Sequence, residues 1–207
     1  MSLQVDKKIY FGSGYFNINR FASYSYQISE IISLKPEKVL EIGVGNGLVS
    51  YLLKEAGIST TTLDFDPSLK PDILASVTDI PAANNFYDVV AAFEVLEHVP
   101  FESFSKAISE MCRVSKKNVI ISLPDCNRFY KIEFLLPKIG KKRLSLELPY
   151  KNPRIHNFDG EHYWEIGKKG FPLRRIIQEI QRIGLEIDRT YRAFEIPYHR
   201  FFILKKM

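Results

Sequence analysis

Residues 39–47 combine the residue types that a small-molecule site needs. Their order is Val-Leu-Glu-Ile-Gly-Val-Gly-Asn-Gly, an apolar strand followed by a glycine-rich turn. Glycines let the backbone bend sharply and come close to a ligand. A helix beginning at Leu48 would present unpaired N–H groups to a molecule bound beside that turn. The stretch therefore predicts a cofactor site at the end of a buried strand.

Glu41, which precedes the first glycine, bears on the kind of cofactor. The spacing is Gly43-x-Gly45-x-Gly47, whereas dinucleotide sites use G-x-G-x-x-G. A carboxylate here would repel a pyrophosphate, but it would attract an ammonium group or a sulfonium-bearing ligand. The pattern thus favours S-adenosylmethionine over a dinucleotide.

Further carboxylates follow other predicted strands. Asp64 comes about 20 residues after Gly43, the separation at which an acidic side chain reaches a ribose hydroxyl pair. A carboxylate suits a vicinal diol because it accepts two hydrogen bonds at once. Asp79 and Glu94 end the next two strand regions. We expect these residues and the glycine turn to share one edge of a sheet.

The elements that position these residues alternate along the chain. Apolar and β-branched runs predict strands at 39–42, 58–64, 71–77, 87–94, 118–123, 185–192 and 198–204. Helical spacing of apolar residues predicts helices at 19–32, 48–54, 101–114 and 171–184. Such alternation predicts an α/β fold with a mainly parallel sheet covered on both faces, and a ligand crevice at the carboxyl ends of its strands.

The length of 207 residues fits a single domain, 1–207. Within it, the aromatic-rich residues 1–35 are expected to form a helical lid, although the aromatic side chains also suit plain core packing. Residues 124–170, interrupted by prolines and glycines, are expected to form an irregular insertion on the substrate side. The chain has no run of about 18 apolar residues and no apolar signal core. We therefore expect no membrane insertion and a cytoplasmic protein.

The net charge of +5 is mildly basic. Basic residues cluster at 138–143, 168–169 and 174–175. Such clusters suit nucleic acid, an anionic lipid surface or a phosphorylated metabolite, but the modest charge density favours a solvated surface.

Four motifs in order give the chain a clear resemblance to the class I (Rossmann-like) S-adenosylmethionine-dependent methyltransferases of small-molecule type. Residues 39–47 are similar to that family's first motif, 63–67 to its second, 78–81 to its third, and 87–90 with 94–98 to its fourth. The resemblance implies a three-layer α/β/α sandwich with a mostly parallel seven-stranded sheet and an antiparallel last strand. It also implies S-adenosylmethionine as cofactor.

The resemblance assigns the cofactor contacts residue by residue. Glu41 would act on the methionine amino group, Asp64 on both ribose hydroxyls, and Asp79 on the adenine amino group. The complete set of expected cofactor-binding residues is Glu41, Gly43, Gly45, Asn46, Asp64, Phe65, Asp79, Ile80 and Glu94. For Asp79, capping of a following turn is the alternative.

Methyl transfer from a sulfonium needs mainly alignment, and a base helps only when the acceptor must first lose a proton. His98, beside the fourth motif, is the first choice for that base. Other candidates are His156, His162, His199, Tyr15, Tyr24, Tyr163 and Glu165. Residues 162–165 are expected to shape the acceptor pocket or simply to pack a loop on the sheet.

Glu94, Glu97 and His98 raise the question of a metal. Residues at positions i, i+3 and i+4 share a face of a helical turn, and this set can hold a divalent ion. The pattern resembles one in ubiquinone-pathway O-methyltransferases, where it is linked to a metal, but many relatives need none. We assign no metal-ligating residue from the sequence.

The predicted function is methyl transfer to a small-molecule acceptor, with O- or C-methylation favoured. The alternatives are a methyltransferase acting on RNA or protein, and a non-catalytic S-adenosylmethionine-binding protein. No Asn/Asp-Pro-Pro-aromatic tetrad follows the fourth strand, which counts against amino methylation of a nucleobase. Cys126 lacks a nearby activating residue in the sequence, which counts against a cysteine nucleophile. The oligomeric state is left open.

Overall fold

The computed structural model describes residues 7–12 and 14–207. The expected lid includes residues 1–6 and 13, which lie outside this part. Seven strands form the main sheet: β1 (Lys38–Ile42), β2 (Ser59–Asp64), β3 (Ile73–Leu74), β4 (Tyr87–Phe93), β5 (Ser115–Pro124), β8 (Leu185–Arg192) and β9 (His199–Lys206). Within the described residues there are also five α-helices: α1 (Lys8–Phe11), α2 (Ile18–Ser33), α3 (Leu48–Glu55), α4 (Phe104–Val114) and α5 (Leu173–Arg182).

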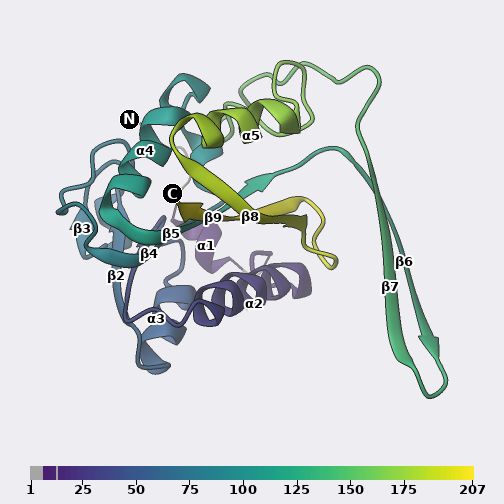
Figure 1. Ribbon diagram of the computed structural model, residues 1–207, viewed down its shortest axis with the longest axis horizontal. Helices are drawn as coiled ribbons and strands as arrows, with labels where there is room; N and C mark the ends of the chain where they lie inside the picture. Colours follow the sequence, from purple (N-terminus) through teal and green to yellow (C-terminus); the bar gives the residue numbers. More distant parts are fainter. Residues whose placement is uncertain (1–6, 13) are drawn as a thin grey trace.

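The main sheet has the strand order β3-β2-β1-β4-β5-β9-β8. The strands β1 to β5 pair in parallel, whereas β9 runs antiparallel to both β5 and β8. This confirms the predicted seven-stranded, mostly parallel sheet with an antiparallel last strand. Helices α2 and α3 lie on one side of the sheet, and α4 and α5 lie on the other (Figure 1).

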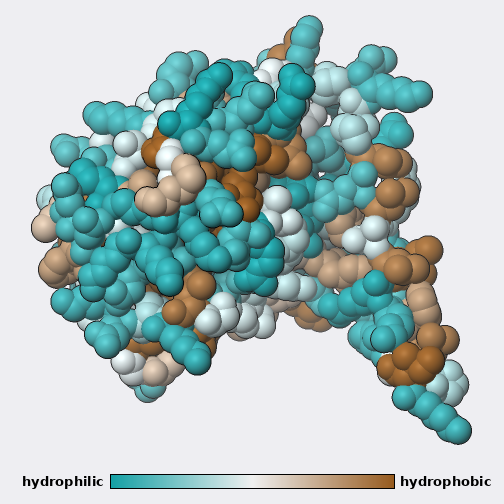
Figure 2. Space-filling view, viewed as in Figure 1, coloured by the Kyte–Doolittle hydropathy of each residue, from teal (hydrophilic) through white to brown (hydrophobic). Residues whose placement is uncertain are grey.

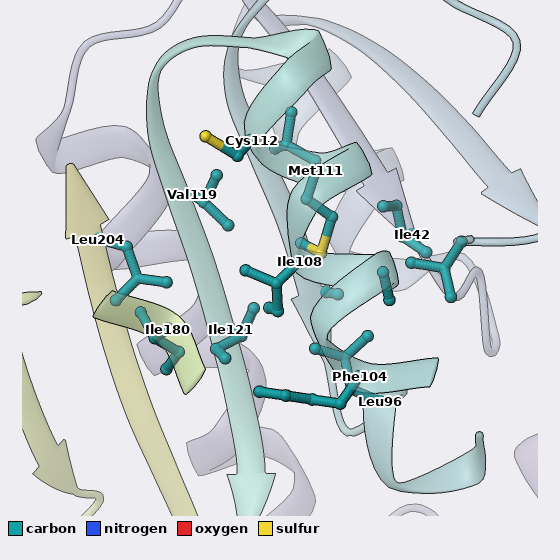
Figure 3. Close-up of a cluster of buried hydrophobic side chains, with 14 of the residues drawn as sticks. Ile42, Leu96, Phe104, Ile108, Met111, Cys112, Val119, Ile121, Ile180 and Leu204 are labelled. Atoms are coloured by element: carbon teal, nitrogen blue, oxygen red, sulfur yellow. The ribbon is translucent and has the colours of Figure 1, made fainter. Parts of the chain in front are cut away.

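The side-chain alternation of β1 explains why both sheet faces are apolar. Val39 packs with the α2 and α3 side chains, while Leu40 and Ile42 pack with those of α4 and α5. Figure 3 shows the larger cluster, in which Ile108 and Met111 of α4 meet Val119 and Ile121 of β5. Central parallel strands are buried on both faces, so they read as continuous apolar runs. The core thereby holds the carboxyl ends of β1, β2 and β4 in fixed positions.

The segment after β5 corrects the prediction for residues 124–170. Instead of irregular chain, residues 128–148 form a hairpin of β6 (Arg128–Leu136) and β7 (Gly140–Leu148). Figure 1 shows this hairpin projecting from the body as an arm. An alternation of apolar and polar residues runs along both strands, and the prolines and glycines around it obscured that period. Residues 149–172 have no helix or strand.

No helix in the described part of the chain is long and apolar enough to cross a bilayer.

A buried ion-pair cluster joins the base of the hairpin to β9. Asp125, which is 1% exposed, accepts a hydrogen bond from Arg200 Nε at 2.7 Å. Arg192 donates to the carbonyl oxygens of Asp125 at 2.8 Å and Asn127 at 2.9 Å. Its Nη1 also lies 3.8 Å from an Asp125 carboxylate oxygen. Two guanidinium groups thus satisfy one carboxylate out of water, at the point where the chain leaves β5.

Asp125→Ala should lower the free energy of unfolding by about 3–5 kcal/mol, because it removes the buried anion that Arg192 and Arg200 share. Urea denaturation measures this change. Glu133→Gln is the control, since Glu133 pairs with Lys141 and Arg143 on the surface of the hairpin and such pairs contribute about 0–1 kcal/mol. Equal effects of the two substitutions would show that burial does not govern the Asp125 cluster.

Candidate functional site

Two adjoining hollows lie at the carboxyl ends of β1, β2 and β4. The β2-side hollow is bounded by Leu63, Phe65, Leu69, Ser76 and Val77. The α2-side hollow, of about 400 Å³, is bounded by α2 and by segments near residues 161 and 198. The side chains or backbone that line both are Tyr10, Gly43, Asp64, Glu94, Val95 and His98. These shared residues make the two hollows parts of one site.

The glycine turn follows β1 as predicted and borders the site. Gly43 has φ +86°, and a Cβ placed there would lie 2.4 Å from Val95 Cγ2. Gly43 is therefore required both by backbone conformation and by space. Gly45 also has a positive φ of +55° and lines the α2-side hollow. Asn46 lines the same hollow, and its Oδ1 accepts from Leu48 N at 3.1 Å, which closes the first turn of α3.

Glu41 lies in the α2-side hollow as a buried carboxyl group. It is 3% exposed, and its Oε2 has no hydrogen-bond partner among the described residues. Burial raises the pKa of Glu41 to about 8, against the opposing influence of Ser50 and Lys54. A buried unpaired acceptor costs free energy unless a ligand satisfies it. The position suits a cationic group of a bound molecule.

Arg20 supplies the opposite charge in the same hollow and was missed by the sequence analysis. It lies in the first turn of α2, which Asn17 caps by accepting from Arg20 N at 3.0 Å. Its guanidinium lies 4.4 Å from the centroid of the Tyr15 ring and makes no ion pair with a described residue. A single arginine at the start of a helix carries no sequence signal of its own. Together, Arg20 and Glu41 offer charges of both signs to one ligand.

Asp64 lies at the end of β2 between the two hollows. Its Oδ2 accepts from Val44 N and its Oδ1 from Asp66 N, both at 2.9 Å. Burial raises the pKa of Asp64, partly offset by these backbone hydrogen bonds. Each carboxylate oxygen has a second lone pair, so the side chain is held in place and can still accept from a ligand. Phe65 is 39% exposed and lines the β2-side hollow.

The structure does not bring Asp79 and Ile80 into the site, which corrects that prediction. Asp79 is exposed at the end of a turn, where its N–H donates to Ser76 O at 3.0 Å. Ile80 is buried in the core, and its N–H donates to Glu110 Oε2 at 3.0 Å. Ser76 and Val77 line the β2-side hollow instead. The turn reverses the chain within four residues, so a shift of three positions decides which side chain meets the hollow.

Glu94 directly follows β4 and has a left-handed conformation, with φ +53°. Its N–H donates to the Ser122 carbonyl and hydroxyl oxygens, both at 3.1 Å. Its Oε1 is buried with no partner among the described residues. Burial raises the pKa of Glu94 to about 7. A non-glycine residue at positive φ with a desolvated carboxyl group is a strained arrangement typical of functional sites.

His98 lines both hollows, as expected for a residue beside the fourth motif. Its Nδ1 lies 3.0 Å from Glu161 O, so Nδ1 carries the proton in that hydrogen bond. Burial, together with the nearby His162 ring, lowers the pKa of His98 to about 4. The His98 imidazole is therefore neutral at pH 7 but is a weak base.

His162 lies beside it, with the two ring centroids 4.9 Å apart. The Nδ1 atom of His162 is 2.9 Å from Glu165 Oε1. Although burial works against the charged ring, the hydrogen bond to Glu165 and its negative charge raise the pKa of His162 above the usual value. Glu165 also accepts from Tyr198 Oη at 2.5 Å and from Cys126 Sγ at 2.8 Å. These bonds lower the pKa of Glu165 despite its burial.

Two contacts anchor the segment that carries His162. Tyr163 N donates to Glu97 O at 2.9 Å, and Trp164 Nε1 donates to Val99 O at 3.1 Å. The Trp164 ring is fully buried and packs against Phe101 and Phe104. An irregular stretch is thus held rigidly against the end of β4.

Burial, together with the hydrogen bond to Glu165, raises the pKa of Cys126 to about 12, so the structure gives no support to a cysteine nucleophile.

Among the described residues, two donor sets that share His162 have the composition of a metal site: Glu97, His98 and His162, and Asp159, His162 and Glu165. Single ligand atoms of Glu97, His98 and His162 lie within 4.8 Å of one another. Glu97 is fully buried, and both of its carboxyl oxygens lack a hydrogen-bond partner among the described residues. Burial and the neighbouring Glu94 raise its pKa. One carboxylate and two imidazoles fit a divalent ion, with His162 in the place that the sequence pattern gave to Glu94.

The family model and the related sequences that match this chain are all described as methyltransferases. A family model described as a methyltransferase domain matches residues 40–123. The "Ubiquinone biosynthesis O-methyltransferase" of Rickettsia canadensis is 27% identical over 131 residues, covering 57% of this chain and 52% of that protein. This chain thus spans about half the length of that relative. An "Uncharacterized methyltransferase" of Staphylococcus carnosus is 26% identical, covering 81% of this chain and 79% of that protein.

Solved structures share the fold at low sequence identity. The magnesium protoporphyrin IX methyltransferase of Synechocystis, with bound S-adenosylmethionine, has a TM-score of 0.60 at 17% identity and covers 98% of this chain and 90% of its own. The 1,6-didemethyltoxoflavin-N1-methyltransferase of Burkholderia thailandensis has a TM-score of 0.59 at 12% identity. The match covers 90% of this chain and 79% of that protein.

Glu41 should make the stability of the ligand-free protein depend on pH. Its pKa is raised in the folded state, from 4.5 to about 8, so its stabilising contribution is complete below pH 4.5 and is lost as the pH rises toward 8. The loss is at most about 1.4 kcal/mol per pH unit. The free energy of unfolding, measured at several pH values, should therefore fall for the wild type relative to Glu41→Gln as the pH rises from 4.5 to 8.

The exposed Glu55 provides the control. Over this pH window Glu41→Gln should be stabilised relative to Glu55→Gln, because folding buries the Glu41 carboxyl group and leaves that of Glu55 exposed to water. A difference between Glu41→Gln and the wild type that is constant from pH 4.5 to 8 would contradict the assigned burial effect.

Proposed function

We propose that this chain, which belongs to the class I S-adenosylmethionine-dependent methyltransferases, transfers a methyl group from S-adenosylmethionine to a small-molecule acceptor held in the α2-side hollow. The observation that carries the proposal is the continuity of the two hollows around Gly43, Asp64 and Glu94. One hollow can take a nucleoside while the other keeps room for an amino-acid tail and an acceptor.

The donor fits the polar groups that the chain leaves unsatisfied. Glu41 Oε2, which has no hydrogen-bond partner among the described residues, suits the ammonium group. The Arg20 guanidinium, which makes no ion pair with a described residue, suits the carboxylate of the methionine part. Gly43 and Gly45 allow the backbone to approach closely. When bound, S-adenosylmethionine supplies a methyl group on a positively charged sulfur, which a nucleophile displaces in line.

The nucleoside end fits the β2-side hollow. The remaining lone pairs of Asp64 would accept from the ribose hydroxyls, and backbone hydrogen bonds from Val44 and Asp66 keep that carboxylate in position. Phe65, Leu69 and Val77 provide apolar contacts for the adenine ring. Ser76, rather than Asp79, is the polar side chain at the edge of this hollow.

The acceptor would lie against aromatic side chains of the α2-side hollow. Tyr15, Tyr24 and Phe93 line it, together with His162 and His199. Burial lowers the pKa of His199 to about 3, so this ring is neutral and serves as a hydrogen-bonding wall. A small, largely apolar acceptor with one ionisable hydroxyl or acidic carbon suits such a lining. The name of the Rickettsia relative supports O-methylation over C-methylation.

His162 is the better general base for an acceptor that must lose a proton. The Glu165 carboxylate holds the proton on Nδ1, which leaves Nε2 as the acceptor, and it stabilises the charged ring that forms. The groups facing His162 are Glu94, Asp159, Glu165 and His98. His98, the sequence prediction, would then orient the acceptor, because its low pKa makes it a poor proton acceptor.

A divalent ion held by Glu97, His98 and His162 would instead act as a Lewis acid that lowers the pKa of a bound hydroxyl group. In that case the His162–Glu165 pair would keep the ligating ring oriented.

The alternative of an RNA or protein acceptor draws on the basic residues. Lys138, Lys141, Lys142 and Arg143 all belong to the hairpin or its turn, and none of them lines either hollow. The site chemistry therefore supports the small-molecule acceptor. A non-catalytic role in binding S-adenosylmethionine is the remaining alternative.

Calorimetry with S-adenosylmethionine tests the donor site. The wild type should bind, and Asp64→Asn should weaken binding at least about tenfold, because it replaces a charged acceptor that serves two hydroxyl groups. Asp79→Asn is the matched control and should bind like the wild type, since Asp79 lies outside the hollows. Absence of binding to the wild type would overturn the proposed function, and equal losses in the two variants would overturn the assignment of Asp64.

Substitution of the two histidines separates their roles. With a methyl acceptor identified from a metabolite panel, His162→Gln should lower kcat by about 10²–10⁴, the usual contribution of a general base. Glu165→Gln should move the acid limb of the pH–rate profile to lower pH, because Glu165 raises the pKa of His162. His98→Gln should affect mainly KM. If only His98→Gln removes the acid limb, the original choice of His98 is correct.

A further inference from the structure

The hairpin of β6 and β7 carries an apolar face that no described residue covers. The pairing sets Tyr130 opposite Leu146 and Ile132 opposite Leu144, and paired residues point to the same side of a two-stranded ribbon. The members of this apolar face are Tyr130, Ile132, Phe134, Leu136, Leu144, Leu146 and Leu148. Their exposed fractions run from 37% for Phe134 to 63% for Ile132. Figure 2 shows brown, apolar residues along the projecting arm.

The opposite face of the ribbon is mostly polar, with Phe129 and Leu135 as its apolar members, and is tied to the body of the protein. Lys131 Nζ donates to Phe194 O at 2.9 Å, and Arg143 Nη2 pairs with Glu195 Oε1 at 2.6 Å. Glu147 pairs with Arg200. These contacts fix the orientation of the ribbon, so its apolar face is turned away from residues 194–200. A contiguous surface of seven exposed apolar side chains is typical of an interaction site.

The charge of the hairpin indicates the kind of partner. Residues 128–148 contain six basic and two acidic side chains, so they carry +4 of the net charge of +5 of the whole chain. Both acids are already paired, Glu133 with Lys141 and Arg143, and Glu147 with Arg200. Lys138 and Lys142 make no ion pair with a described residue. Lys138 lies in the turn, and Lys142 is paired with Phe134 next to it, so both charges lie beside the apolar face. Arg128, at the base of the hairpin, also makes no ion pair with a described residue and lies over the Tyr150 ring.

The tip itself combines the same two properties. Leu135 and Ile139 are 76% and 61% exposed, and Lys138 lies between them in the turn. Lysine stems can lie along an apolar surface while their charged ends reach an anionic layer. Aliphatic side chains bordered by lysines match acyl chains beneath anionic headgroups.

Other occupants fit less well. In a dimer with the two apolar faces in contact, two ribbons of +4 would face each other, which opposes association. Nucleic acid would use the lysines but would leave the leucine and isoleucine side chains in water. We propose that the β6–β7 hairpin is a peripheral docking surface for a lipid bilayer containing anionic lipids, with its apolar face lying in the interfacial layer.

The proposed contact is interfacial and does not span the bilayer. A two-stranded ribbon has unpaired backbone groups along both edges, and these cannot be placed in the hydrocarbon core. Binding would combine burial of apolar side chains with attraction of Lys138 and Lys142 to the headgroups. The expectation of no membrane insertion was based on the lack of a spanning segment, and this proposal adds a surface contact to it.

Vesicle co-sedimentation tests the proposal with the full chain. The protein should bind vesicles of phosphatidylcholine with about one-third phosphatidylglycerol, bind pure phosphatidylcholine at least about tenfold more weakly, and lose affinity as salt is raised. Two variants should each reduce binding at least about tenfold. The apolar triple variant carries Ile132→Ser, Leu144→Ser and Leu146→Ser, and the double lysine variant carries Lys138→Glu and Lys142→Glu.

Lys106→Glu/Lys117→Glu, on exposed positions of α4 and β5, is the charge-matched control and should bind like the wild type. Binding of S-adenosylmethionine by each variant reports that it is folded, and the lysine pair tests the surface even if the apolar triple variant does not fold. Three results would overturn the proposal: no vesicle binding, equal binding to both vesicle types, or a lipid-free dimer that the apolar triple variant converts to a monomer.

Discussion

Three glutamates are buried at the carboxyl ends of the central strands, and the site depends on the free-energy cost of burying their carboxyl groups. Glu41, Glu94 and Glu97 together have four carboxyl oxygens with no partner among the described residues. Burial raises the pKa of each. A fold keeps such groups buried only when the packing of the surrounding core is stable enough to hold them in place. Here the parallel strands β1 and β4, buried on both faces, provide that stability.

The same desolvation that opposes folding prepares the site for a cationic ligand. An electrostatic interaction is stronger in a site from which water is excluded. A proton, an ammonium group or a metal ion near these carboxylates would relieve the cost, and ligand binding would then stabilise the folded chain by mass action. Binding of a positively charged donor and the pH-dependent stability expected of the ligand-free protein thus have one physical origin.

The segment between β5 and α5 has two parts with different positions: residues 161–165 border the site, and the β6–β7 hairpin projects from the surface. Residues 161–165 are fixed to the end of β4 by the Trp164 and Tyr163 hydrogen bonds, which brings His162 beside His98. The hairpin leaves the body at Asp125, where two arginines hold the chain. A rigid junction lets the arm extend while the active-site edge keeps its geometry. The acceptor-side wall and the proposed lipid contact are therefore neighbours in the sequence but separate surfaces.

The sequence by itself determined the order of the elements, the glycine turn, and the placement of Glu41, Asp64 and Glu94 at strand ends. These features follow from local periodicity and from the conformational freedom of glycine, which act over a few residues. Only the tertiary structure decided the position of Asp79, where a tight turn exposes that side chain and presents Ser76 to the hollow. It also decided the pairing of His162 with Glu165 near His98, the role of Arg20, and which face of the hairpin is free. Each of these depends on contacts between distant residues, which spacing along the chain does not encode.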